Sequence, residues 1–257
     1  MSDTYTLTMD KPVEKSLLDS SAQGLIGKGL DRVDGPKKVS GQATYSAEYT
    51  FENDCYGFLV RAPFAVGRIT KIDTQTAKAL PGVIDVVTDF ERFIRNSAQG
   101  AVKSAPVQGV RDVAYFGEPV AIVVAEGYEQ ARDAASLVRI EHEAGRGNFD
   151  FAEAIADADI PPDGAAPATH DQGDLDKAMG DADATVDEVW TTPSQNSAAM
   201  EPHASVALWD DDGLTLYGSY QMPSFDRPSL ADALGLETEQ VRIITPYIGG
   251  GFGSKLG

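Results

Sequence analysis

The stretch best suited to chemistry is the glycine-rich run at residues 249–255, Gly-Gly-Gly-Phe-Gly-Ser-Lys. It follows an apolar, strand-like run at residues 241–244. Glycines after a strand let the backbone approach a ligand closely, and successive N–H groups in such a turn form a concavity suited to anions. On composition alone, a flexible tail or a hairpin turn is an equally good interpretation. The run therefore predicts a ligand loop only if other segments support it.

The spacing of this run excludes the two commonest phosphate-binding loops. The GxxxxGK[ST] pattern is absent, and no acidic residue follows a GxGxxG at the distance that a dinucleotide-binding fold requires. Ser254 could begin a helix as its N-cap. Because the sequence stops soon after this residue, we expect the chain to be the N-terminal part of something larger.

Few other residues are suited to bind a metal or a cluster. His142, His170 and His203 show no HExxH pattern and no paired spacing, so a zinc site is not expected. Cys55 is the single cysteine, which excludes an internal disulfide and a four-thiolate iron–sulfur cluster carried by this chain. We expect Cys55 to be a small apolar residue at the start of a strand.

The overall charge limits the kinds of partner. The chain has 257 residues, 42% of them hydrophobic, and a formal net charge of −19. This size allows a full core and predicts two domains, and the acidic balance argues against nucleic acid, whose phosphates require a basic face. No apolar run is long enough to span a membrane, and no export signal is visible. We therefore expect no membrane partner and a cytoplasmic location, with a periplasmic one reached on a partner's signal as the alternative.

The elements that must position the glycine run begin after a polar tail at residues 1–23. Residues 24–147 predict a compact mixed α/β domain. Its entrance carries a local excess of positive charge at Lys28, Arg32, Lys37 and Lys38, interpreted as a solvated loop or as a docking surface for an acidic neighbour. Strands are expected at residues 56–62, 68–73, 83–87, 119–125 and 138–142, helices at 74–80 and 128–137, and a loop at 96–111. The strand at 119–125 is nearly all apolar, so we expect both of its faces to be buried.

Composition changes after this domain. Residues 148–183 are rich in aspartate, alanine and proline and predict a solvated acidic linker with a short helix at 174–179. The second domain, residues 184–257, predicts strands at 186–192, 205–209, 214–220 and 241–244, a hairpin turn at 210–213 and a helix at 223–234. Gly235 would end that helix. Strand, helix, strand and glycine run then form a βαβ-like unit with a ligand loop at a strand's carboxyl end.

Three segments in fixed order resemble a known family. They are Ala-Met-Glu-Pro-His at residues 199–203, Ser-Tyr-Gln-Met-Pro at 219–223 and the glycine run at 249–255. Together they look like the large, molybdenum-carrying subunit of the xanthine oxidase and aldehyde oxidase family of molybdenum hydroxylases. Residues 32–45 and 117–125 are similar to this family's a/b hammerhead domain. The resemblance covers the chain from about residue 27 and implies a hammerhead domain followed by an incomplete molybdopterin-binding domain.

The resemblance implies a pterin–molybdenum cofactor, in the cytosine dinucleotide form, that this chain binds incompletely. Gln221 stands where the family has a glutamine whose amide reaches a molybdenum oxo ligand, and a neutral amide can donate there without adding charge. The alternative for Gln221 is a polar residue at a strand end that caps the following helix. Gly250, Gly251, Phe252 and Gly253 match the family's loop whose backbone contacts the cofactor.

Two further positions follow from the same resemblance. Glu201 and His203 match a segment that we interpret as structural, holding the loop. Leu256 stands in the substrate pocket, where purine-oxidising members have a glutamate. Since an aliphatic side chain cannot hydrogen-bond to a purine, we expect an aldehyde or an N-heteroaromatic substrate and not xanthine.

The chemistry implied is hydroxylation of an electron-poor carbon with oxygen from water. The family's catalytic glutamate and further pterin-binding segments lie downstream of residue 257, so we assign no catalytic and no directly metal-binding residue here. The implied partners are the rest of the large subunit, an iron–sulfur (2Fe–2S) subunit and an FAD subunit. The alternative hypothesis is a non-catalytic truncated or split module that binds partner subunits but no cofactor.

Overall fold

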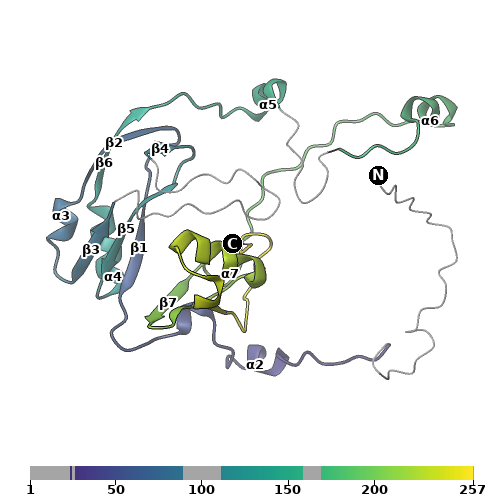
Figure 1. The fold of residues 1–257 in the computed structure, drawn as a ribbon. Helices are drawn as coiled ribbons and strands as arrows, with labels where there is room; N and C mark the ends of the chain where they lie inside the picture. Colours follow the sequence, from purple (N-terminus) through teal and green to yellow (C-terminus); the bar gives the residue numbers. More distant parts are fainter. Residues whose placement is uncertain (1–23, 25–26, 89–110, 159–168, 257) are drawn as a thin grey trace. The chain divides into compact units, whose positions relative to one another are not determined.

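The computed structural model describes residues 24, 27–88, 111–158 and 169–256 (Figure 1). The chain divides into two units, residues 1–43 and 44–257, and the tail predicted at residues 1–23 lies outside the described part. The described part of the first unit contains the helix α2 (Gly35–Val39), where the sequence predicted only a loop. Arg32 and Lys38 both form ion pairs with Asp34 at 3.1 Å. Two of the entrance's basic side chains therefore have an acidic partner within their own segment.

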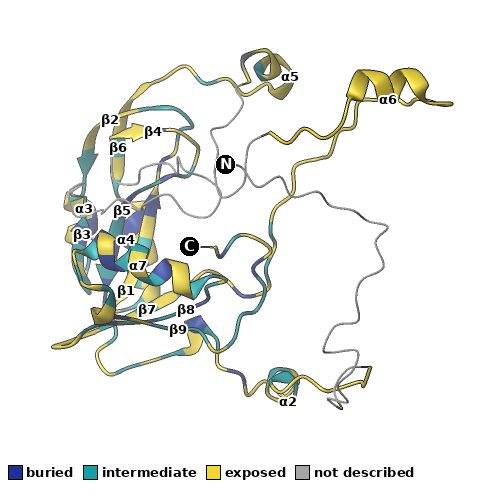
Figure 2. Ribbon diagram, turned by 45° about the vertical axis from the view of Figure 1, so that its right-hand side comes forward, coloured by how far each residue is buried: buried dark blue, intermediate teal, exposed yellow. Residues whose placement is uncertain are grey.

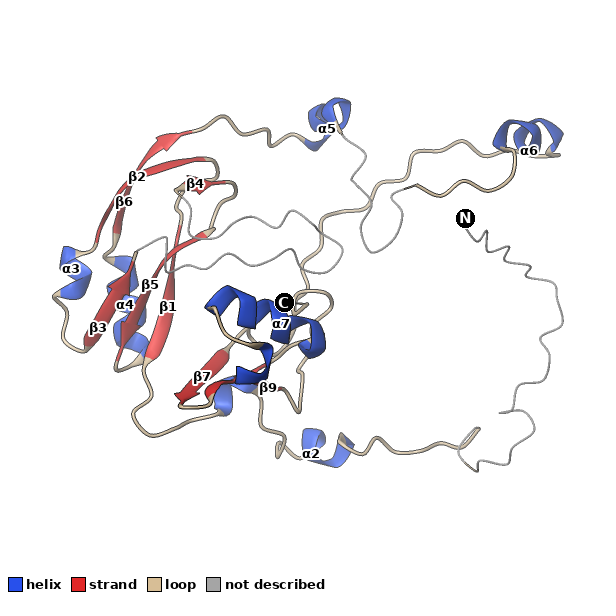
Figure 3. Ribbon diagram, in the orientation of Figure 1, coloured by secondary structure: helices blue, strands red, loops and turns tan. Residues whose placement is uncertain are grey.

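The second unit begins with two three-stranded antiparallel sheets, ordered β1-β5-β3 and β4-β2-β6 (Figure 3). The strands are β1 (Tyr56–Arg61), β2 (Gly67–Asp73), β3 (Val83–Val87), β4 (Asp112–Val113), β5 (Pro119–Ala125) and β6 (Arg139–Ala144). The helices are α3 (Gln75–Lys78) and α4 (Tyr128–Ser136). The mixed α/β fold is thus confirmed. β4 was not predicted, and the loop predicted at residues 96–111 lies almost wholly outside the described residues.

The core of this part lies around β5, the central strand of its sheet. Adjacent residues Val120 and Ala121 point to opposite faces of β5 and are both buried, which confirms the prediction for this strand. On α4, the small residues Ala131 and Ala134 are fully buried, so that the helix packs closely against β1 and β5. Ile69 of β2 belongs to the same hydrophobic cluster, so one core is shared by both sheets. Burying such an aliphatic side chain stabilises the fold by about 1.5–3 kcal/mol.

The linker contains two short helices that bury no residue. They are α5 (Phe151–Ala154), followed by the 3-10 turn η2 (Ile155–Asp157), and α6 (Leu175–Asp181). Asp150 and Asp174 begin these helices as N-caps: Asp150 accepts hydrogen bonds from two backbone N–H groups of the first turn, and Asp174 accepts one. α6 is exposed along its length (Figure 2), which agrees with a solvated segment. The helix predicted at residues 174–179 is confirmed, whereas α5 was not predicted.

The third sheet carries the candidate site and has the order β7-β8-β9. β7 (Ser205–Asp210) and β8 (Gly213–Gly218) form an antiparallel hairpin, and β9 (Val241–Ile244) runs parallel to β8. Between β8 and β9 lie α7 (Pro223–Leu234), which packs against β9, and the 3-10 turn η3 (Thr238–Gln240). Gly235 ends α7 in the left-handed conformation at φ 66°. The βαβ unit predicted before the glycine run is therefore confirmed.

The strand predicted at residues 186–192 is wrong. The structure assigns no regular secondary structure to that range, and none of the described strands pairs with it. Val189 and Trp190 are 91% and 87% exposed. A mixed polar and apolar pattern indicates a strand only where a neighbouring strand supplies backbone hydrogen bonds. Here that neighbour is missing from the described part of the chain.

No helix in the described ranges is long and apolar enough to cross a membrane.

Candidate functional site

The glycine run forms a compact turn after β9. Gly250, Phe252 and Gly253 have positive φ angles of 102°, 51° and 90°, which glycine adopts freely and other residues adopt at a cost. Phe252 is 76% exposed. The turn therefore reverses the chain within a few residues and leaves the phenylalanine ring on the surface.

Hydrogen bonds within the turn fix its backbone. Both the N–H and the hydroxyl of Ser254 donate to the carbonyl of Gly251, at 2.9 and 2.7 Å. The hydroxyl of Ser197 donates to the carbonyl of Phe252 at 3.0 Å. Within the described residues, the N–H groups of Gly250, Gly251 and Phe252 donate no hydrogen bond. Ser254 thus closes the turn, and three backbone N–H groups have no partner among the described residues.

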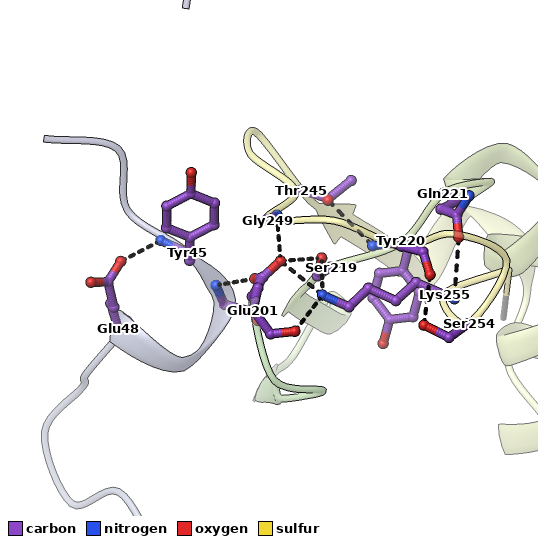
Figure 4. A network of polar contacts seen from close by, with 12 residues as sticks. Tyr45, Glu48, Glu201, Ser219, Tyr220, Gln221, Thr245, Gly249, Ser254 and Lys255 are labelled. Atoms are coloured by element: carbon purple, nitrogen blue, oxygen red, sulfur yellow. Dashed lines mark hydrogen bonds and ion pairs between the residues drawn. The ribbon is translucent and has the colours of Figure 1, made fainter. Parts of the chain in front are cut away.

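Gln221, just after the end of β8, lies against this turn (Figure 4). Its side-chain oxygen Oε1 accepts hydrogen bonds from the N–H groups of Gly253 and Lys255, at 3.1 and 3.3 Å. Its own N–H donates to the carbonyl of Lys255 at 2.7 Å. Only the oxygen end of a glutamine amide can accept, so these two donors determine which end faces the loop. The amide –NH₂ is left to donate to another group.

The close approach of Gln221 and the loop requires a glycine at residue 251. A Cβ atom built on Gly251 would lie 2.4 Å from Oε1 of Gln221 and 2.5 Å from its Cδ. Both distances are far shorter than any van der Waals contact allows. Gly251 is therefore the position at which an absent side chain makes room for the glutamine amide.

The buried carboxylate of Glu201 holds the glycine run. Oε1 of Glu201 accepts hydrogen bonds from the N–H and the hydroxyl of Ser46, at 3.3 and 3.0 Å. Oε2 accepts from the hydroxyl of Ser219 at 2.6 Å, from the N–H of Gly249 at 2.7 Å and from Nζ of Lys255 at 2.9 Å (Figure 4). Both oxygens of the carboxylate are thus fully engaged.

The ion pair between Glu201 and Lys255 is shielded from water, with side-chain exposures of 5% and 1%. Nζ of Lys255 also donates to the carbonyl of Glu201 at 3.0 Å and to the hydroxyl of Ser219 at 3.2 Å, so its three protons all have acceptors. Burial alone would raise the pKa of Glu201. Hydrogen bonds from Ser219, Gly249, Lys255 and Ser46 outweigh burial and lower this pKa from 4.5 to about 2. The carboxylate is therefore charged throughout the physiological range.

Aromatic rings hold the segment that brings in Ser46, which opens the 3-10 turn η1 (Ser46–Glu48). The ring of Tyr217 in β8 lies 4.5 Å from that of Tyr49 and 5.3 Å from that of Phe51, measured between centroids. Burial raises the pKa of the Tyr49 hydroxyl, which agrees with this packing. Aromatic pairs at such distances add about 0.5–1.5 kcal/mol beyond their buried area.

The remaining predicted residues lie at the edge of this arrangement. Glu201 contacts the glycine loop, whereas His203 is exposed and no described residue hydrogen-bonds to its ring. His203 lines a small pocket of about 60 Å³, together with Ser219 and Lys255. Leu256 is 39% exposed. Its role in a substrate pocket stays a prediction.

Sequence reasoning missed three members of the anchor: Ser46, Ser219 and Lys255. Ser219 and Lys255 stand inside the segments that carry the family resemblance, so a buried partner for Glu201 could have been sought there. Ser46 is 155 residues away from Glu201 and gives no local signal. In the described ranges, no three His, Cys, Asp or Glu side chains lie together in a way that could hold a metal ion.

Comparison with known proteins identifies both parts of this architecture. Residues 40–145 match the aldehyde oxidase and xanthine dehydrogenase a/b hammerhead domain, and residues 158–257 match the molybdopterin cofactor-binding domain. The chain therefore belongs to the xanthine oxidase and aldehyde oxidase family of molybdenum hydroxylases, whose large subunits carry these two domains.

Individual relatives agree with this assignment. The aldehyde oxidoreductase molybdenum-binding subunit PaoC of Escherichia coli (strain K12) is 39% identical over 252 residues, covering 97% of this chain and 34% of that protein. The nicotinate dehydrogenase large molybdopterin subunit of Eubacterium barkeri is 31% identical, covering 90% and 56%. The reconstituted CO dehydrogenase from Oligotropha carboxidovorans superposes with a TM-score of 0.73 at 27% identity, covering 89% and 32%. The chain thus spans about a third to a half of the length of these relatives.

Proposed function

We propose that this chain supplies the hammerhead domain and the first part of the cofactor domain of a molybdenum hydroxylase, which oxidises an aldehyde or an N-heteroaromatic compound with oxygen from water. The observation that carries the proposal is the fixed amide of Gln221. Its oxygen is held by the N–H groups of Gly253 and Lys255, so its –NH₂ is free to donate to the cofactor. We place the two domains at residues 24–147 and 184–257.

The residues of the site fit a pterin–molybdenum group. When bound, the cofactor supplies a two-electron oxidation, and the chain's own residues bind and orient it. The N–H groups of Gly250, Gly251 and Phe252 are donors without a partner in the described chain, and a group with oxygen and ring-nitrogen acceptors can use them. Gly253 takes part through the N–H that holds Gln221. We assign no proton transfer and no catalytic residue to this part of the protein.

The proposed substrate class rests on Leu256 and on the relatives. A partly exposed leucine offers a substrate an apolar surface and no hydrogen bond. The relative at 39% identity is named for aldehydes, and one at 31% is named for nicotinate, an N-heteroaromatic acid. Both compounds present the electron-poor carbon that this chemistry requires.

The proposed partners follow from the electrons that the oxidation releases. The single cysteine, Cys55, is exposed and cannot by itself hold an iron–sulfur cluster, so we place a 2Fe–2S subunit and an FAD subunit beside the rest of the large subunit. For the cofactor we propose the cytosine dinucleotide form, and for the compartment the cytoplasm.

The test is the molybdenum content of the protein purified from its native host, by elemental analysis together with the intact mass of the chain. We expect about one molybdenum per chain and co-purifying polypeptides. Gln221→Ala should lower this ratio, whereas Gln172→Ala, at an exposed position in the linker, should not change it. A lone 27.3 kDa species without metal would overturn the proposal and favour the non-catalytic module. Release of CMP on acid hydrolysis would establish the dinucleotide form.

A further inference from the structure

Lys255 connects two features of the site that share no direct contact. Its side chain lies in the buried anchor, with Nζ 2.9 Å from Oε2 of Glu201. Its backbone bonds to Gln221 in both directions, donating to Oε1 at 3.3 Å and accepting from the N–H at 2.7 Å. One residue therefore joins the buried carboxylate to the exposed glutamine.

We propose that Glu201 is a positioning residue, which acts through Lys255 and the glycine loop to set the orientation of the Gln221 amide. This proposal rests on the proposed function in one respect, namely that Gln221 is the residue that donates to the cofactor. Neither Glu201 nor Lys255 would touch the cofactor in this role.

The geometry shows why the anchor controls the loop. The single oxygen Oε2 of Glu201 binds the N–H of Gly249 and the ammonium of Lys255, so one atom holds both ends of the glycine run. Between these ends, Phe252 is mostly exposed and Ser254 bonds within the turn. Lys255 is consequently the buried side chain through which the turn is fixed to the core.

The orientation of Gln221 depends on that fixation because the glutamine has little support of its own. It is an exposed residue with three side-chain torsions, and the side-chain bonds that hold its amide come from the N–H groups of Gly253 and Lys255. A shift of the loop would release the amide, which would then sample several rotamers. Holding it in one orientation before the cofactor arrives removes that entropy cost from binding.

The donors around position 201 explain why this residue is a glutamate and not a glutamine. Five hydrogen bonds converge on its two oxygens, and each oxygen faces at least one donor that cannot accept. These donors are the N–H of Ser46 at Oε1, and the N–H of Gly249 and the ammonium of Lys255 at Oε2. Glu201→Gln keeps the shape but turns an –NH₂ group toward donors, whichever way the amide lies. This near-isosteric change should therefore loosen the loop without removing any packing.

The experiment uses nuclear magnetic resonance on the cofactor-free 257-residue chain. The variants are Glu201→Gln and Lys255→Met, with Lys71→Met as the matched control because the Lys71–Glu141 pair is exposed. The readouts are hydrogen exchange of the backbone amides at positions 253 and 255 and the side-chain –NH₂ resonances of Gln221, assigned by their loss in Gln221→Ala.

We expect both anchor variants to exchange at least about tenfold faster at positions 253 and 255, and the Gln221 resonances to move toward those of a freely rotating amide. Exchange at positions 253 and 255 should rise more than exchange in the backbone of β8 and β9, which follows global unfolding, and Lys71→Met should alter neither readout. Unchanged exchange at position 253 would overturn the proposal. An equal rise in β8 and β9 would also overturn it, since the anchor would then act only on the fold.

A double variant keeps the proposal testable if a single one does not fold. Removing one partner of a buried ion pair leaves a lone charge and is strongly destabilising, whereas replacing both is often nearly neutral. Glu201→Gln with Lys255→Met should therefore be more stable than either single variant and still lose protection at position 253. Wild-type protection there would contradict the proposal. Since all readouts come from the cofactor-free chain, a negative molybdenum measurement would affect the proposed function and leave this result intact.

Discussion

The hydroxyl of Ser46 donates to Oε1 of Glu201 at 3.0 Å, across 155 residues of sequence, and both residues are buried. Ser46 belongs to the aromatic-rich segment that packs on Tyr217 of β8, and Glu201 precedes β7. The same carboxylate binds Gly249 at the start of the glycine run. The loop that we assign to the cofactor therefore depends on a residue far from it in sequence.

The low pKa of Glu201 predicts a specific loss of stability in acid. A pKa lowered from 4.5 in the unfolded chain to about 2 in the folded one favours the folded state by up to about 3 kcal/mol. This contribution is fully present above pH 4.5 and is lost as the pH falls from 4.5 to about 2. Urea unfolding from pH 7 to pH 2.5 should therefore show the gap between wild type and Glu201→Gln narrowing in acid.

Other carboxylates also titrate over this range. The prediction therefore concerns the difference in unfolding free energy between wild type and Glu201→Gln at each pH. Glu141→Gln is the matched control, because Glu141 forms an exposed ion pair with Lys71 and contributes about 0–1 kcal/mol. Its difference from wild type should stay small at every pH. A constant gap for Glu201→Gln between pH 7 and pH 2.5 would show that the carboxylate is not held as described.

Gly251→Ala should affect the site more than the fold. The new methyl group would displace the flexible end of Gln221, which lies 2.4 Å from the built Cβ atom, and not a backbone segment. We expect the free energy of unfolding to fall by no more than about 1 kcal/mol. The molybdenum content of the protein from its native host should fall with the loss of the Gln221 orientation. Gly180→Ala, at an exposed site in α6 with open space around it, should leave the molybdenum content unchanged.

A neutral substitution at Asp226 should have the opposite effect and stabilise the chain. It lies in α7 with 7% exposure, and its Oδ2 has no hydrogen-bond partner among the described residues. Burial raises its pKa, so the charged form destabilises the folded state above that pKa and the penalty disappears as the pH falls. Asp226→Asn should therefore stabilise the chain by about 1 kcal/mol at neutral pH, with a gain that shrinks in acid.

Thermal unfolding at pH 7 and pH 4 would measure this gain. Asp232→Asn, at an exposed position in the same helix, should change the melting temperature little at either pH. A loss of stability in Asp226→Asn at pH 7 would indicate that the carboxylate has a partner outside the described residues.

Much of the fold could be predicted because its signals are local. The apolar run of β5, the small-residue face of α4 and the glycine that ends α7 each lie within one element. The strand predicted at residues 186–192 failed because pairing is not local: Val189 and Trp190 are suited to a strand, but no described strand lies beside them. The helix α5 was missed because four residues carry too little periodicity.

The sequence by itself determined the family, through short segments whose residue types and order are specific, and with it the candidate loop and Gln221. Only the tertiary structure decided how that glutamine is held. The bonds from Gly253 and Lys255 to its oxygen, and the convergence of Ser46, Ser219 and Lys255 on Glu201, join residues that sequence distance separates. A buried charge requires nearly every donor around it to be matched, and folding alone brings those donors to one point.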